Sequence, residues 1–270
     1  MSDRARRYWE SPRIVAAYAR DGRLLPGERA LLERVARDGL RPRVLDIGVG
    51  AGRTTRFLVP VASRYVGIDL SRRMIETCIA RFGESPTVEF RVADARDLPF
   101  PDASFEVVLF SYCGIDDLTD PLDRRRAITE MARVATPGGW VALSAHNLNT
   151  VVYHFSARRR LAELSWRRPT RIPHVLGHAL KAVGGKLINP PPHRLARLET
   201  ACIRDTLYRG RILKTWYARP DAQIQELEAL GLGVDCVLDD EGKPASRESL
   251  GSLSAVVPYY LCRKPEDRKR

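Results

Sequence analysis

The stretch VLDIGVGAGRTT, residues 44–55, decides the fold because it joins an apolar run directly to a glycine-rich turn. Its apolar beginning indicates a buried parallel strand. Gly48, Gly50 and Gly52 follow at alternate positions, and glycine lets the backbone turn tightly and approach a ligand closely. An arginine comes directly after the third glycine, so the G-x-G-x-x-G pattern of dinucleotide-binding turns is not met. The stretch therefore predicts a strand, a ligand-binding turn and then a helix.

The alternation of strands and helices continues beyond this turn. Ser71 and Gly83 are a plausible cap and stop for one helix, and Pro60 disturbs the end of the helix expected over 53–62. Alternating strands and helices predict an α/β fold with a doubly wound, seven-stranded, mostly parallel sheet. The seven strands are expected at residues 43–47, 65–70, 88–94, 105–112, 140–146, 233–240 and 255–264, and the main helices at 72–82, 121–135 and 221–231.

Acidic residues stand at the ends of the first three predicted strands, and ligands of such sheets bind at the carboxyl ends of the strands. Asp46 would repel a pyrophosphate and attract a cationic ligand. Asp69 can accept hydrogen bonds from vicinal ribose hydroxyls, and Asp94 can accept one from the exocyclic amine of adenine. The three acids predict a ligand with a cationic group, a ribose and an adenine. The alternative is that the glycines form a tight turn and the acids cap helices.

Four segments in this order resemble the class I S-adenosylmethionine-dependent methyltransferases. VLDIGVGAG is similar to their first motif, VGIDLS to the second, ADARDLPFPDASFEVV to the adenine-side segment, and ARVATPGGW to the turn before strand five. The resemblance covers about residues 40–147 and, more loosely, 215–262. It implies a Rossmann-like fold, methyltransferase activity and S-adenosylmethionine as the cofactor. It also implies that Asp46, Gly48, Gly50 and Gly52 hold the methionine part, Asp69 and Leu70 the ribose, Asp94 and Ala95 the adenine, and that Ser111 lies beside the sulfonium.

A basic insertion follows the fifth predicted strand. Residues 156–216 contain fourteen Lys or Arg and three Asp or Glu, a net of +11, while the whole chain has +12. We therefore divide the chain into a leading helix with the cofactor-binding part, 1–147, a basic and mostly helical lid, 148–215, and the last helix with the closing strands, 216–270. Helical spacing predicts an apolar inner face for the lid, made of Leu176, Leu180, Val183 and Leu187.

A cationic lid beside a cationic cofactor makes physical sense if the methyl acceptor is anionic, because like charges repel. Arg171, His174, His178 and Lys181 share one helical face and are the predicted substrate-binding residues. The alternatives are a solvated charged surface and an RNA contact in which nearby aromatic residues stack on bases. No recognised RNA-binding module is found, so we favour a small-molecule acceptor over RNA. A cofactor-binding protein without methyl transfer is a third interpretation.

His146 ends the fifth predicted strand and is the candidate general base, because an amine or hydroxyl acceptor has to lose a proton. Its alternative role is structural, with the ring bonded to a loop carbonyl. Asp116 and Asp117 follow the fourth strand, and helix capping is their favoured role over catalysis. The spacing of His174 and His178 suits a metal, but no nearby carboxylate or thiol completes a set, so no metal is predicted.

The first segment, MSDRARRYWESPR, has no apolar region of the kind found in secretory signals. No apolar run approaches the roughly 18 residues that a membrane span needs. The five cysteines are scattered, which suits a reducing compartment, and we expect a cytoplasmic protein. Tyr8, Trp9 and Tyr18 lie in the leading helical region, where they either pack against the sheet edge or close over the cofactor.

Overall fold

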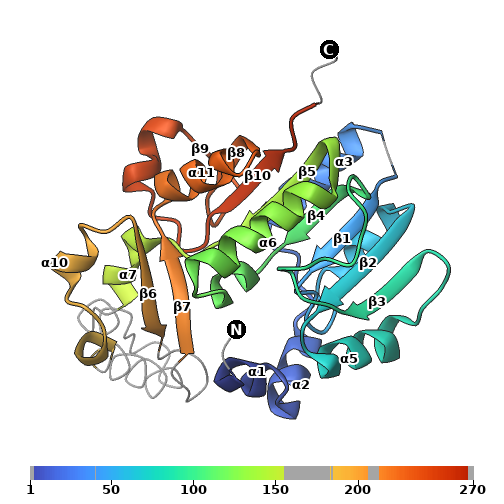
Figure 1. Cartoon of the computed structure of the whole chain (residues 1–270), viewed down its shortest axis with the longest axis horizontal. Helices are drawn as coiled ribbons and strands as arrows, with labels where there is room; N and C mark the ends of the chain where they lie inside the picture. The colour runs from blue at the N-terminus through green and yellow to red at the C-terminus, as the bar shows by residue number, and fades with distance from the viewer. Residues whose placement is uncertain (1–2, 40, 155–182, 184, 206–212, 267–270) are drawn as a thin grey trace, which may run out of the picture.

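A central sheet organises the structure, a computed structural model that describes residues 3–39, 41–154, 183, 185–205 and 213–266. Its eight strands follow the order β3-β2-β1-β4-β5-β10-β8-β9 (Figure 1). The pairs from β3 to β5 are parallel, and β10 is antiparallel to both of its neighbours. The predicted doubly wound, mostly parallel α/β sheet is therefore confirmed. It has one strand more than the seven expected, because the two residues of β9 extend its edge.

The bounds of the sheet strands agree with the sequence to within a few residues, except that β5 begins five residues earlier than expected. The strands are β1 Arg43–Ile47, β2 Arg64–Asp69, β3 Val88–Val92, β4 Phe105–Phe110, β5 Ala135–Ser144, β8 Gly233–Leu238, β9 Pro244–Ala245 and β10 Tyr259–Arg263. The helices around them are α1 Asp3–Trp9, α2 Pro12–Arg20, α3 Pro26–Arg37, α4 Thr55–Leu58, α5 Arg72–Phe82, α6 Pro121–Val134 and α11 Pro220–Ala229.

Local sequence explains where two of these helices begin or end. The Ser71 hydroxyl accepts a hydrogen bond from the Met74 backbone N–H and so caps α5, which stops at Gly83 with φ of 70°. The helix expected over 53–62 is short, because α4 ends at Leu58 and continues as the 3₁₀ turn η1, Val59–Val61. Pro60 lies within that turn, where its ring opposes continued α-helix.

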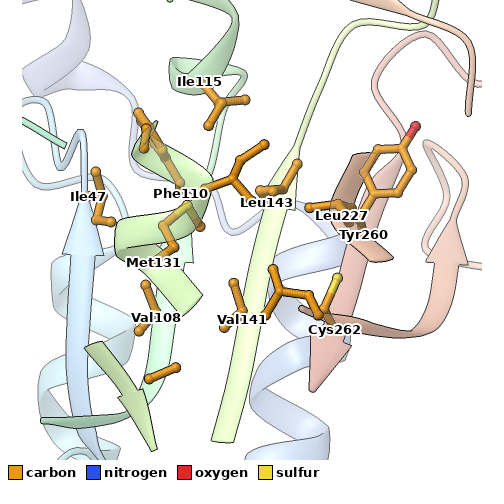
Figure 2. Packing of buried hydrophobic residues seen from close by; sticks show 14 of the residues in the cluster. Ile47, Val108, Phe110, Ile115, Met131, Val141, Leu143, Leu227, Tyr260 and Cys262 are labelled. Atoms are coloured by element: carbon orange, nitrogen blue, oxygen red, sulfur yellow. The ribbon is translucent and has the colours of Figure 1, made fainter. Parts of the chain in front are cut away.

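Helices cover both faces of the sheet, and each face has its own apolar cluster. On one face α6 and α11 contribute Met131 and Leu227, which pack against Phe110, Val141 and Tyr260 (Figure 2). On the other face the cluster is built from α3, α4 and α5, with Leu31, Leu58 and Ile75 among its buried members. Because both faces are covered, the carboxyl ends of the strands are the edge at which a ligand can reach the sheet.

The chain after β5 differs from the predicted helical lid in its last part. Helices α7 Leu148–His154 and α10 Pro192–Leu195 are present, but β6 Thr200–Asp205 and β7 Leu213–Ala218 form an antiparallel pair. The helical prediction is wrong there, where β-branched and aromatic residues such as Ile203, Thr215 and Trp216 favour strands. Val183 is 46% exposed and Leu187 is 82% exposed, so the predicted inward face is also wrong for these two residues. Leu176 and Leu180 lie outside the described residues.

The β6–β7 hairpin is attached to the rest of the fold at both of its ends. Near β5, the backbone N–H of Ala218 donates to the carbonyl of His146 at 3.1 Å. At its other end, Leu213 is buried with Tyr8 and Met74 in a small apolar cluster of the N-terminal helices. The hairpin therefore spans from the end of β5 to the N-terminal helices. None of the described helices is long and apolar enough to cross a membrane.

Candidate functional site

A cavity of about 550 Å³ lies at the carboxyl ends of the parallel strands. Trp9 and Tyr18 of the N-terminal helices line it, which favours a closing role for that region over simple packing, while Tyr8 is buried beside them. His146 lines it from the end of β5. The strand-end loops contribute residues 46–51, 69–71, 93–95 and 111–114. All the predicted cofactor residues except Gly52 therefore line one cavity, although their contacts with a cofactor stay a prediction.

The three glycines of the turn have different roles. Their φ angles are 64°, 56° and 81° at Gly48, Gly50 and Gly52, a left-handed conformation that favours glycine. A Cβ on Gly52 would lie 2.3 Å from Cε2 of Phe82, so this glycine is needed for packing. A Cβ on Gly50 would have its nearest neighbour at 3.6 Å, on Tyr18, so this part of the turn presents open backbone to the cavity.

Asp46 is buried and held by two hydroxyl groups. Thr54 Oγ1 and Tyr65 OH donate to its Oδ2 at 2.5 and 2.9 Å. Burial raises the pKa of Asp46 to about 6. Both hydroxyls use Oδ2, so they leave the accepting capacity of Oδ1 unused. A carboxylate held in this way supplies negative charge to the cavity that it lines, as the sequence predicted.

Asp69 connects the glycine turn to the start of α5. Its Oδ2 accepts from the backbone N–H of Gly50 at 3.0 Å, and its Oδ1 accepts from that of Ser71 at 2.8 Å. Burial raises the pKa of Asp69 to about 6. Each carboxylate oxygen has a second lone pair, so Asp69 retains the capacity to accept from a ribose diol. This geometry fits the predicted ribose-binding role, and Leu70 lines the cavity next to it.

Asp94 is more strongly engaged than the sequence suggested. The Arg96 guanidinium donates to both of its oxygens, with the shortest contact at 2.6 Å, and this pair lowers the pKa of Asp94. Arg96 also bonds Asp123 at 2.6 Å. The Asp94 carboxylate lines the cavity beside Ala95, but any adenine amine would share it with Arg96.

A buried ion pair near the glycine turn was missed by sequence reasoning. The Arg53 guanidinium donates to the Glu28 carboxylate at 2.7 and 2.5 Å, and Glu28 is only 2% exposed. Ser111 donates its hydroxyl to the same carboxylate and lies 2.6 Å from the hydroxyl of Tyr259. Ser111, predicted beside the sulfonium, is thus tied into this network. Arg53 stands where the dinucleotide-binding pattern has its third glycine. This unexpected arginine was the sequence feature that could have pointed to the ion pair.

The ring of His146 is hydrogen-bonded to a carboxylate. The alternative structural role predicted a bond to a loop carbonyl instead. Its Nδ1 lies 2.8 Å from Asp116 Oδ2, and its backbone N–H donates to the same oxygen at 2.7 Å. The other carboxylate oxygen accepts from Arg124 Nη1 at 2.8 Å. Asp116 and Arg124 are both fully buried. Asp116 therefore holds the imidazole and does not cap the next helix, whose N-cap is Asp120.

Three residues of types that can ligate a metal lie close together at this corner of the cavity. Ligand atoms of Cys113, Asp116 and His146 lie within 4.8 Å of one another. Both oxygens of Asp116 already have partners, so within the described structure the group is a hydrogen-bonded network. His174 and His178, whose spacing suits a metal, lie outside the described part of the chain.

Acidic groups dominate the charge on the described cavity wall. Burial and the charge of Asp116 raise the pKa of Asp117 to about 7, and burial leads among the causes at Asp46 and Asp69 as well. Such a wall suits a cationic ligand. The predicted substrate-binding residues Arg171, His174, His178 and Lys181 lie outside the described residues. The charged residues lining the cavity are Asp46, Asp69, Asp94, Asp117, Asp239, Asp240, Arg6, Arg53 and His146.

Residues 44–139 match the family model described as a methyltransferase domain. The chain is 34% identical over 135 residues to a demethylmenaquinone methyltransferase of Clavibacter sepedonicus, covering 48% of this chain and 54% of that protein. It is 34% identical over 105 residues to the O-methyltransferase cnsE of Penicillium expansum, covering 37% of each. The chain thus spans about half, or less, of the length of these curated relatives.

A solved S-adenosylmethionine-dependent methyltransferase of Clostridium acetobutylicum has the same fold. It superposes with a TM-score of 0.60 and 12% identity, covering 89% of this chain and 91% of the other. The sheet order, the glycine turn and the matched domain define a Rossmann-like methyltransferase fold. Residues 44–139 are therefore a methyltransferase domain, and the chain around them has the fold of the S-adenosylmethionine-dependent methyltransferases.

Proposed function

We propose that this protein transfers a methyl group from S-adenosylmethionine to an oxygen or nitrogen of a small, anionic acceptor. The observation that carries the proposal is the His146–Asp116 pair, which meets the glycine turn and the strand-end acids in one cavity. The relatives named demethylmenaquinone methyltransferase and O-methyltransferase support a small-molecule acceptor. The five unpaired cysteines support a reducing compartment, and we assign the protein to the cytoplasm.

The chain's own residues fit the cofactor. Asp46 supplies negative charge, Asp69 accepts from the ribose, and the open backbone at Gly50 allows close approach of the ligand. The cofactor supplies a methyl group on a positively charged sulfur, whose C–S bond breaks as the acceptor forms the new bond. Orientation of the two reactants is the main contribution of such a site, worth roughly 7–11 kcal/mol.

His146 is the proposed general base. It accepts the proton that the acceptor hydroxyl or amine loses, and the Asp116 carboxylate stabilises the imidazolium that results. General-base catalysis contributes typically about 10²–10⁴-fold. The proposed anionic group of the acceptor lies on the side of the basic segment 156–216, because the described wall is mainly acidic. Arg171, His174, His178 and Lys181 are the proposed contacts of that group.

The test uses S-adenosylmethionine labelled in its methyl group, mixed with a low-molecular-mass cell extract or with total RNA. We expect label in the small-molecule fraction and a loss of about 10²–10⁴-fold in His146→Gln, with cofactor affinity unchanged. His193→Gln is the matched control, because His193 is an exposed histidine of α10. Equal turnover by the two variants would refute the base assignment.

The same assay separates the competing functions. An RNA methyltransferase would label RNA, and its RNA affinity would fall with salt with a log–log slope near −0.7 per phosphate contacted on a single strand. A non-catalytic cofactor-binding protein would bind S-adenosylmethionine and label neither pool. A small anionic acceptor that touches one or two cations would show a much shallower dependence on salt.

A further inference from the structure

His146 is backed by a buried carboxylate and a buried arginine. A general base needs neither group in order to accept a proton. The carboxylate that holds its Nδ1 is completely buried, as is the arginine that pairs with this carboxylate. Leaving a buried carboxylate without a partner would be strongly destabilising, and Arg124 provides that partner at 2.8 Å. Neither Asp116 nor Arg124 is among the site residues predicted from the sequence.

Several hydrogen bonds hold the Arg124 guanidinium in place, and the guanidinium in turn holds the Asp116 carboxylate. Its guanidinium donates to the carbonyl of Ile115 at 3.2 Å, to the side-chain amide oxygen of Gln223 and to Glu226 Oε2 at 3.1 Å. Gln223 and Glu226 belong to α11, so two helices of one sheet face meet at this arginine. Rotation of the Asp116 carboxylate would break its hydrogen bonds to this fixed guanidinium and to His146.

Asp116 also orients the imidazole relative to its own backbone. One oxygen, Oδ2, is shared by the backbone N–H and Nδ1 of His146, which restrains both the main chain and the ring. Tyr217 of β7 supports the ring from the side, with centroids 4.8 Å apart and planes inclined by 38°. A carboxylate at Nδ1 favours the tautomer with its proton there and leaves Nε2 as the basic nitrogen.

The backbone before this network is itself unusual. Tyr112 and Cys113 have φ angles of 57° and 58°, two consecutive non-glycine residues in the left-handed region. Such strain persists where the surrounding structure enforces it, and it concentrates at functional sites. Here it turns the chain from β4 into the 3₁₀ turn η2, Gly114–Asp117, which carries Asp116. The Cys113 N–H is secured by Ser144 Oγ at 3.0 Å.

We infer that Asp116, clamped by Arg124, is a positioning residue that fixes the tautomer and orientation of His146 for proton transfer from the acceptor. This inference rests on the proposed function for its catalytic part, whereas the tautomer is a property of the protein alone. The proton moves from the acceptor oxygen or nitrogen to Nε2 as the acceptor bonds to the methyl carbon. After product release, the imidazolium returns that proton to solvent.

The charged and titratable groups that face His146 agree with this role. They are Cys113, Asp116 and Asp117 from the β4–η2 region and Tyr217 from β7. Burial lowers the pKa of His146, but Cys113 and Asp116 raise it, and the result lies well above the usual value. Burial raises the pKa of the Cys113 thiol, which also shares a hydrogen bond with the His146 ring. Activity should therefore rise with pH as His146 loses its proton.

The experiment is histidine-ring NMR on ¹⁵N-labelled, cofactor-bound protein, combined with the pH profile of kcat. The His146 signal is assigned by its loss in His146→Gln. In the wild type we expect an Nδ1–H tautomer and a raised pKa. Asp116→Asn should move the ring proton to Nε2, shift the acidic limb of the kcat profile to lower pH and reduce kcat by about 10²–10⁴-fold. Cofactor affinity should stay within about twofold of the wild type.

Glu226→Gln is the matched control, because it removes a carboxylate that pairs with Arg124 Nε, whereas Asp116 pairs with Arg124 Nη1 and with His146. Its thermal stability should fall, while its tautomer and pH limb stay where the wild type has them. An unchanged tautomer and pKa in Asp116→Asn, or the same changes in both variants, would overturn the positioning role. A changed tautomer together with full transfer by His146→Gln would instead refute the proposed base and leave the Asp116–His146 coupling intact.

Discussion

The ribose assignment predicts that Asp69→Ala weakens binding of S-adenosylmethionine and of its demethylated product alike. A hydrogen bond to a charged group contributes about 1.5–3 kcal/mol, equivalent to roughly 10- to 150-fold in Kd. The structure favours the upper half of this range, because alanine also frees the backbone N–H groups of Gly50 and Ser71 that Asp69 holds at 3.0 and 2.8 Å. Titration calorimetry at neutral pH measures both affinities directly.

Ser71→Ala separates loss of binding from loss of local structure. It removes the helix cap that accepts from Met74 N–H at 3.2 Å, which costs about 1 kcal/mol of stability, but it leaves the Asp69 carboxylate in place. We expect both variants to melt earlier and only Asp69→Ala to bind weakly. Unchanged affinity in Asp69→Ala, or equal loss in the two variants, would refute the assignment.

Two further predictions concern the same edge of the sheet. Burial raises the pKa of Asp46 and of Asp69 to about 6, so both gain protons and lose negative charge as the pH falls through that value. Calorimetry between pH 5 and 8 should then show S-adenosylmethionine losing affinity on the acid side more than its demethylated product, whose sulfur is uncharged; parallel losses would contradict this. Gly50→Ala and Gly52→Ala should each lower the free energy of unfolding by about 1–2 kcal/mol, because alanine disfavours the left-handed backbone. Gly52→Ala should lower it by about 1–3 kcal/mol more, because its Cβ would lie 2.3 Å from Phe82. Denaturant titration that gives the two variants equal stability would exclude this packing role of Gly52.

Local sequence patterns were sufficient for the sheet and for the strand-end acids. Apolar runs of four to eight residues predict buried strands wherever they fall, and the acids are recognisable because each stands at or near the end of such a run. The same logic failed at β6 and β7, where the expected helical pattern was extended across residues that pair as strands. A hairpin there depends on contacts with the end of β5 and with the N-terminal helices, which sequence spacing does not encode.

The buried polar networks could not be predicted, because their members are far apart in the chain. Glu28 and Arg53 are 25 residues apart, and Arg124 and Glu226 are 102 apart. A charged residue in an amphipathic helix is ordinarily solvated, so neither Glu28 nor Arg124 carried a local sign of burial. The sequence did place His146 and Asp116 at neighbouring strand ends. It did not show that one carboxylate would bond both the ring and the backbone of His146.

The distribution of charge between the described wall and the basic segment constrains the acceptor. Asp46, Asp69 and Asp117 make the described wall acidic, which suits the cationic sulfur of the cofactor and is unfavourable for an anionic group placed next to it. The chain's excess positive charge lies instead in residues 156–216. An acceptor that suits both the acidic wall and the basic segment would present a neutral hydroxyl or amine to His146 and an anionic group to the basic segment. Under the proposed function, the reacting atom and the charge of the acceptor are therefore separate groups, and methylation would change the first without changing the second.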